Sequence, residues 1–135
     1  MEIVLQNQPA EKQRLLKALQ AFAVDQRLPD KVVQAADLAL EEHLTNVLNY
    51  GYADTATHEI RVRFWCDAGS FQIEVEDDGR AFNPLEKPEV DASIPLEDRP
   101  VGGLGIHLMR RFMDALDYRR EGDRNILRMT KRLDA

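Results

Sequence analysis

The residues best suited to chemistry gather in three short stretches of the chain. In the first, Glu42 and Asn46 stand four residues apart and Asn49 three further on, so a helix would place all three on one face. Ala35 and Ala39 share that face. Asn and Ala are unusual on an exposed helix and suit the wall of a cavity that holds a metal or a phosphate. The alternative is an ordinary solvated helix surface.

The second stretch follows a run of alternating apolar residues that includes Ile73 and Val75. Continued alternation turns Asp77 to the same buried side, where a carboxylate without partners would cost several kcal/mol. A buried Asp77 could accept a hydrogen bond from an exocyclic amine such as that of adenine. Alternatively the strand has already ended, and Asp77 only begins a turn with Asp78 and Gly79.

The third stretch is a glycine cluster, Gly102, Gly103 and Gly105, directly before a predicted helix. Free N–H groups and the helix dipole at such a start favour a phosphate, although the cluster lacks the Lys and Ser/Thr of a Walker P-loop. Arg80 and Arg99 lie on either side of the intervening segment and could reach a γ-phosphate, because guanidinium groups suit phosphate geometry. Surface arginines beside a loop are the alternative.

The elements that must position these residues follow from apolar periodicity. The predicted order is strand 2–6, helices 9–23 and 31–49, strands 59–66 and 71–75, a proline-rich segment 84–101, helix 106–113, and strands 115–120 and 126–131. Strands joined by hairpins with helices between them predict an α+β fold, a two-layer sandwich with helices on one face of a mainly antiparallel sheet. The segment 84–101 has no periodicity and is predicted to be a lid.

The second helix carries most of the first stretch, and its limits are marked in the sequence. Asp30 is the predicted N-cap and Gly51 the predicted stop. The predicted packing stripe lies opposite the polar face and consists of Val33, Leu40, Leu44 and Val47.

Composition and charge exclude several classes of function. The chain has 135 residues with 18 Lys+Arg against 24 Asp+Glu, a net charge of −6, which argues against a nucleic-acid binder or a polybasic membrane-surface protein. Cys66 is the single cysteine, so no intrachain disulfide or cysteine-based zinc site forms. The first residues show neither a signal peptide nor a membrane span. We therefore expect one domain over 1–135 in the cytoplasm.

Together the three stretches resemble the ATP-binding fold shared by histidine kinases, DNA gyrase B, Hsp90 and MutL, the Bergerat fold. They are most similar to the anti-sigma factor serine/threonine kinases of bacterial partner-switching systems. Residues 42–46 with Tyr50-Gly51-Tyr52 resemble the family's Glu-x-x-x-Asn box, residues 75–81 its Asp-x-Gly-x-Gly box, and residues 103–106 its Gly-x-Gly box. The sequence departs from the pattern at Ala81, where the family usually has a glycine, and at His43, where a small residue is common.

The resemblance implies a role for each box. Glu42 would orient or deprotonate the acceptor hydroxyl, and Asn46 would hold Mg²⁺ against the phosphates of ATP. Asp77 would read adenine, and Gly79 would let the backbone approach the base. Gly103, Leu104 and Gly105 would surround the phosphates with backbone N–H groups.

The function implied is an ATP-dependent protein serine/threonine kinase that phosphorylates a serine of a small antagonist protein of the STAS type and holds a sigma factor. With the edge strand at 2–6, the resemblance also suggests a homodimer. A second hypothesis is a switch that binds ATP or ADP without transferring phosphate. A free-standing catalytic domain of a histidine kinase is a third, and a nucleic-acid binder comes last.

Overall fold

The computed structural model describes residues 1–83 and 109–134. Its elements in chain order are β1 (Glu2–Gln6), α1 (Glu11–Gln26), α2 (Asp30–Tyr50), β2 (Glu59–Asp67), β3 (Ser70–Asp77), β4 (Ala115–Glu121) and β5 (Arg124–Arg132). Residues 109–112 form a short helical segment before β4. In the two described ranges, no helix combines the length and the apolar character needed to cross a membrane.

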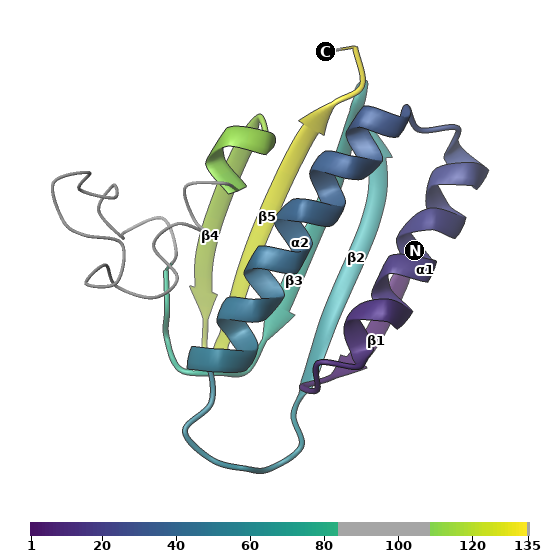
Figure 1. The fold of residues 1–135 in the computed structure, drawn as a ribbon. Coiled ribbons are helices and arrows are strands. Elements are labelled where there is room, and N and C mark those ends of the chain that lie inside the picture. Colours follow the sequence, from purple (N-terminus) through teal and green to yellow (C-terminus); the bar gives the residue numbers. More distant parts are fainter. Residues whose placement is uncertain (84–108, 135) are drawn as a thin grey trace, which may run out of the picture.

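The five strands form one antiparallel sheet in the order β1-β2-β3-β5-β4. Figure 1 shows α1 and α2 lying together on one face of this sheet, with α2 crossing the central strands. The predicted α+β two-layer sandwich is therefore confirmed. The last strand of the chain, β5, occupies an interior position between β3 and β4.

Strict alternation along the central strands supplies the core. Val62, Phe64, Ile73 and Val75 are completely buried, while the residues between them point to the opposite face. Phe22 of α1 stacks on Phe71 of β3 with ring centroids 5.6 Å apart, which joins the helical layer to the sheet. The alternating pattern thus predicted the buried face of both strands correctly.

The predicted N-cap of α2 is wrong by one residue. Pro29 occupies the cap position with extended backbone (φ −61°, ψ 146°), and no side chain caps the helix. Asp30 is instead the first helical residue, where its carboxylate lies in the favourable field of the helix N-terminus. The predicted stop is confirmed, because the helix ends at Tyr50 and Gly51 follows it.

The buried sector of α2 is wider than the predicted stripe. Leu40, Leu44 and Val47 are buried, but Val33 is only half-buried. Val32, Ala35, Ala36 and Ala39 are buried as well. The helix packs both on the sheet below and on α1 beside it, so two neighbouring faces are covered rather than one.

Both hairpin turns have positive φ where two-residue turns require it. Ala68 (φ 50°) and Gly69 (φ 79°) connect β2 to β3, and Gly122 (φ 60°) begins the turn between β4 and β5. The second turn is shorter than the sequence indicated, since Glu121 already pairs with Arg124. Strand β5 therefore begins at Arg124, two residues before the predicted start at 126.

Candidate functional site

Asp77 is the last residue of β3, and it points into the molecule on the helical side of the sheet. Its side chain is 2% exposed, so the predicted continuation of the alternating pattern is confirmed. The turn hypothesis also describes part of the structure, because Asp77 Oδ1 accepts a hydrogen bond from the Gly79 N–H at 2.9 Å. Asp77 therefore ends a strand and shapes the following turn with the same carboxylate.

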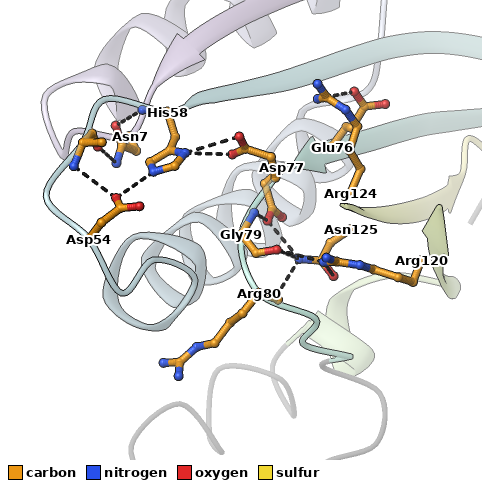
Figure 2. Close-up of polar contacts among 12 residues, drawn as sticks. Asn7, Asp54, His58, Glu76, Asp77, Gly79, Arg80, Arg120, Arg124 and Asn125 are labelled. Carbon is orange, nitrogen blue, oxygen red and sulfur yellow. Dashed lines mark hydrogen bonds and ion pairs between the residues drawn. The ribbon is translucent and has the colours of Figure 1, made fainter. Parts of the chain in front are cut away.

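Asn125 on β5 is a buried partner of Asp77 that sequence reasoning missed. The two residues face each other in the β3–β5 register, and Asn125 Nδ2 donates to Asp77 Oδ1 at 3.0 Å. The Asn125 Oδ1 accepts from Arg120 Nη1 at 3.1 Å, and Arg120 Nη1 also donates to the Gly79 carbonyl at 2.8 Å. Figure 2 shows these side chains converging behind the turn that follows β3.

The turn after Asp77 packs directly against the C-terminal end of α2. The Arg80 N–H donates to the Gly51 carbonyl at 2.9 Å, and the Arg80 Nε donates to the Tyr50 carbonyl at 2.5 Å. A Cβ at Gly79 would lie 2.6 Å from the Gly51 carbonyl oxygen, so only glycine fits there. This contact brings the end of α2 and the end of β3 together, although 25 residues lie between Gly51 and Asp77 in the chain.

Arg80 and Ala81 follow Gly79 in this turn. The Arg80 side chain points away from the Asp77–Asn125 contacts in Figure 2 and neutralises carbonyl charge at the end of α2. In the described residues, only Arg27 and Ala68 among non-glycines have positive φ, so Ala81 is accommodated without strain where the resembling motif has glycine.

Several effects compete on the pKa of Asp77. Burial is the largest and raises the pKa above its ordinary value of 3.8. The hydrogen bonds from Asn125 and from the Gly79 N–H, and the charge of Arg120, lower it, while the neighbouring Asp78 raises it. The donors around Oδ1 therefore partly offset the cost of burying this carboxylate.

The predicted polar face of α2 is divided in the structure. Asn46 is buried at 4% exposure, and its Nδ2 has no hydrogen-bond partner within the described residues. Glu42, one turn earlier, is half-buried, and Asn49 is exposed. The solvated-surface alternative therefore holds for Asn49 and fails for Asn46.

His43 adjoins Glu42 on α2, and its burial was not predicted from the sequence. It is 4% exposed, and neither ring nitrogen has a hydrogen-bond partner in the part of the chain that the structure describes. Burial lowers the pKa of His43 from 6.5 to about 4, so the ring is neutral at physiological pH.

His58 anchors the connection between α2 and β2. Its Nδ1 lies 3.1 Å from Asp78 Oδ1 and its Nε2 lies 2.7 Å from Asp54 Oδ1. Its backbone N–H donates to Asn7 Oδ1 at 2.8 Å, and its ring stacks on Tyr52 at 4.2 Å. Hydrogen bonds to Asp54 and then to Asp78 raise the pKa of His58. Figure 2 shows this cluster beside the Asp77 turn.

The remaining predicted residues lie outside the described ranges. These are Arg99, Gly103, Leu104, Gly105 and the predicted lid at 84–101. The structure therefore places two of the three predicted stretches, the end of α2 and the end of β3, next to one another.

Residues 5–131 match the family described as Histidine kinase-like ATPase domain. The serine/threonine-protein kinase BtrW of Bordetella bronchiseptica is 26% identical over 112 residues, which cover 83% of this chain and 79% of that protein. The serine-protein kinase RsbW of Halalkalibacterium halodurans is 30% identical over 103 residues, covering 73% of this chain and 62% of that protein. The anti-sigma F factor of Thermoanaerobacter pseudethanolicus is 28% identical over 114 residues, covering 82% and 78%.

Solved structures share the fold. A Mycobacterium tuberculosis protein with RsbU and RsbW domains matches with a TM-score of 0.67 at 12% identity, over 98% of this chain and 31% of that chain. The histidine kinase domain of the blue-light activated kinase of Erythrobacter litoralis matches with a TM-score of 0.58 at 21% identity, over 93% and 60%. The family match covers nearly the whole chain and agrees with the resemblance drawn from the three boxes. The chain therefore belongs to the histidine kinase-like ATPase family.

Proposed function

We propose that the protein is an ATP-dependent protein serine/threonine kinase that acts as an anti-sigma factor and phosphorylates a serine of a small antagonist protein. The observation that carries the proposal is the buried Asp77 carboxylate, held beside the end of the helix that presents Glu42 and Asn46. Relatives named as serine-protein kinases and anti-sigma factors support this reading. Nucleotide use follows from membership of the family.

The residues around Asp77 fit a purine base. Among the described residues, both hydrogen bonds of the Asp77 side chain end on Oδ1, so Oδ2 is left to accept from an exocyclic amine. Gly79 keeps the backbone of the turn close to α2, because any Cβ would meet the Gly51 carbonyl. Asp77 would thus bind and orient the adenine of ATP.

The residues on α2 fit a magnesium-bound triphosphate. An amide oxygen is a hard ligand of the kind Mg²⁺ takes, and Mg²⁺ commonly uses one or two protein ligands together with phosphate oxygens. Asn46 is buried and its Nδ2 is unbonded in the described residues, so no hydrogen bond of Nδ2 within those residues opposes an amide orientation that offers the oxygen to a metal. When bound, Mg²⁺ would neutralise charge on the transferring phosphoryl group.

Glu42 is the candidate general base. It lies one helical turn from Asn46 and is half-buried, so it is reachable by the hydroxyl of an acceptor serine. The Glu42 carboxylate would orient that hydroxyl and accept its proton as the bond to phosphorus forms. Nucleotide binding alone does not need a carboxylate at this position.

The partners belong to the same proposal. We propose a STAS-type antagonist as the acceptor, a sigma factor as the second partner, and a homodimer. In the described sheet β1 pairs only with β2, so its outer edge is available to a second copy. Cys66 is a free and exposed thiol, which suits a reducing compartment such as the cytoplasm.

Substitution of Glu42 separates transfer from binding. In the Glu42→Gln variant we expect ATP affinity to change little, while phosphoryl transfer to a cognate antagonist falls by about 10² to 10⁴. Calorimetry would measure the affinity, and labelled ATP would measure the transfer. Glu41→Gln is the matched control, because Glu41 is exposed and pairs with Lys12 of α1 at 3.0 Å.

The outcome also distinguishes the kinase from the binding-only switch. Transfer at the wild-type rate in Glu42→Gln would remove the general-base role. Tight ATP binding by the wild type without transfer to a proven antagonist would favour the switch.

A further inference from the structure

We propose that Asn125 is a positioning residue for the selection of a 6-amino purine over a 6-oxo purine, because its amide donates to Oδ1 of Asp77 and so holds that side chain with a hydrogen-bond acceptor toward the base. The inference rests on the proposed function, since it concerns the base that Asp77 would bind. It deepens that function by assigning the selectivity to a residue on a different strand, β5.

The surroundings of Asn125 allow only one orientation of its amide. Its Oδ1 lies 3.1 Å from Arg120 Nη1 and 3.4 Å from the Phe82 backbone nitrogen, and both of these groups can only donate. The Tyr118 hydroxyl donates to the same oxygen at 2.5 Å. Its Nδ2 lies 2.9 Å from the Arg80 carbonyl, which can only accept. A flipped amide would place donors against donors and an oxygen against an oxygen.

The fixed amide of Asn125 in turn determines which oxygen of Asp77 accepts a hydrogen bond from it. Asn125 Nδ2 must donate toward Asp77, and it does so to Oδ1 at 3.0 Å. The Gly79 N–H donates to that same oxygen at 2.9 Å. Two donors on Oδ1 leave Oδ2 as the acceptor that a base would meet. An acceptor at this point complements the amine of adenine and repels the carbonyl oxygen of a 6-oxo purine.

The charged groups around Asp77 keep this acceptor in place. Arg120 contacts both Asn125 and the Gly79 carbonyl, and its charge favours the ionised form of Asp77. Asp78 opposes ionisation of Asp77 but is itself engaged by His58 at 3.1 Å. The acceptor therefore depends on a network that spans β3, β4, β5 and the turn.

The decisive variant is Asp77→Asn, measured with ATP and with inosine triphosphate (ITP). The new side chain must turn its oxygen toward the donors of Asn125 and Gly79, so its NH₂ takes the place of Oδ2 and points at the base. We expect ATP to bind about 10-fold to 100-fold more weakly and ITP to become the preferred nucleotide. If the side chain at 77 were free to rotate, it would present its oxygen to adenine, and ATP affinity and preference would be retained. That result, or an equal loss of both nucleotides, would overturn the inference.

A second variant, Asn125→Ser, tests the positioning role directly. Binding of ATP by the wild type should weaken as the pH falls through the pKa of Asp77, because the protonated carboxyl no longer offers an acceptor. Loss of the Asn125 donor raises that pKa further, so the acid limb of ATP binding should move to higher pH, and the preference for ATP over ITP should shrink. A residue with a merely structural role would leave the limb where it is, and an unmoved limb in the folded variant would refute the proposal.

Thr130→Val is the matched control. The Thr130 hydroxyl donates to Gln72 at 2.8 Å and so links β5 to β3 on the opposite face of the sheet. This variant should keep the wild-type preference for ATP and the wild-type acid limb. A wild-type protein that binds neither nucleotide would refute the proposed function and this inference with it. A wild-type protein that prefers ATP, with no reversal in Asp77→Asn, would refute the inference alone.

Discussion

The buried histidine on α2 predicts an unusual pH dependence of stability, which His43→Leu should remove. Leucine fills a similar space, has no titratable group and suits a helix. His43 is neutral in the folded protein, because burial lowers its pKa to about 4, whereas the unfolded chain keeps a value near 6.5. Between about pH 4 and pH 6.5, His43 therefore carries a proton in the unfolded chain but not in the folded protein.

The sign and size of the effect follow from proton linkage. A lowered pKa in the folded state means that acid favours unfolding, so stability is lost as the pH falls below about 6.5 and the loss levels off near 4. The slope is at most about 1.4 kcal/mol per pH unit, and the loss between pH 7 and pH 5 is about 2 kcal/mol. His43→Leu should also gain stability at pH 7, since it removes two buried ring nitrogens that have no hydrogen-bond partner in residues 1–83 and 109–134.

Urea unfolding of both proteins from pH 7.5 to pH 4.5 measures the difference in unfolding free energy. Carboxylates common to the two proteins cancel in that difference, so it should grow by about 2 kcal/mol on going from pH 7 to pH 5. His58→Gln is the control with the opposite sign. Asp54 and Asp78 raise the pKa of His58 in the folded protein. The stability that His58 contributes is therefore fully present below about pH 6.5 and is lost as the pH rises through the folded-state pKa.

A pH-independent difference between wild type and His43→Leu would refute this reasoning. It would mean that the His43 ring takes up its proton in the folded protein as readily as in the unfolded chain, which requires water or a partner beside the ring.

Two further substitutions test the packing of the site. Gly79→Ala should lower the unfolding free energy by about 1–3 kcal/mol and weaken ATP binding, because the new Cβ would lie 2.6 Å from the Gly51 carbonyl oxygen. Thermal unfolding measures the first effect and calorimetry the second. The control is Gly122→Ala, whose Cβ meets open space and which should leave ATP binding unchanged. Asn46→Leu should raise the unfolding free energy by about 1 kcal/mol, since it removes a buried Nδ2 that lacks a partner in the described residues, while magnesium-dependent ATP binding weakens. Equal ATP affinity with and without magnesium in both wild type and Asn46→Leu would argue against a metal at Asn46.

The strands and the inward side chain of Asp77 could be predicted because the signal is local. A period of two along β3 is carried by a few adjacent residues and continues unchanged to Asp77. The extent of burial on α2 could not be predicted in the same way. Which faces of a helix are covered depends on its neighbours, and α2 has both α1 and the sheet against it, so Asn46 is buried while Asn49 is exposed.

The role of Asn125 could not be predicted from the sequence either. It follows Gly122 and Asp123 closely and is typical of a turn, so the predicted strand began one residue after it. Its partner Asp77 is 48 residues away. The two meet only through the register of β3 with β5, and a single sequence carries no signal for the register of strands that are not neighbours in the chain.

The interior position of β5 has a consequence for synthesis on the ribosome. Until the β4–β5 hairpin has emerged, β3 is an edge strand with unpaired backbone groups, although β1, β2 and both helices are already available. The nascent chain would then expose a hydrogen-bonding edge at which two unfinished chains can pair. Asp77 also lacks its partner Asn125 until this stage, so the proposed adenine site is incomplete before the hairpin docks. If ATP binds at that site, it should stabilise the finished domain more than any earlier folding intermediate.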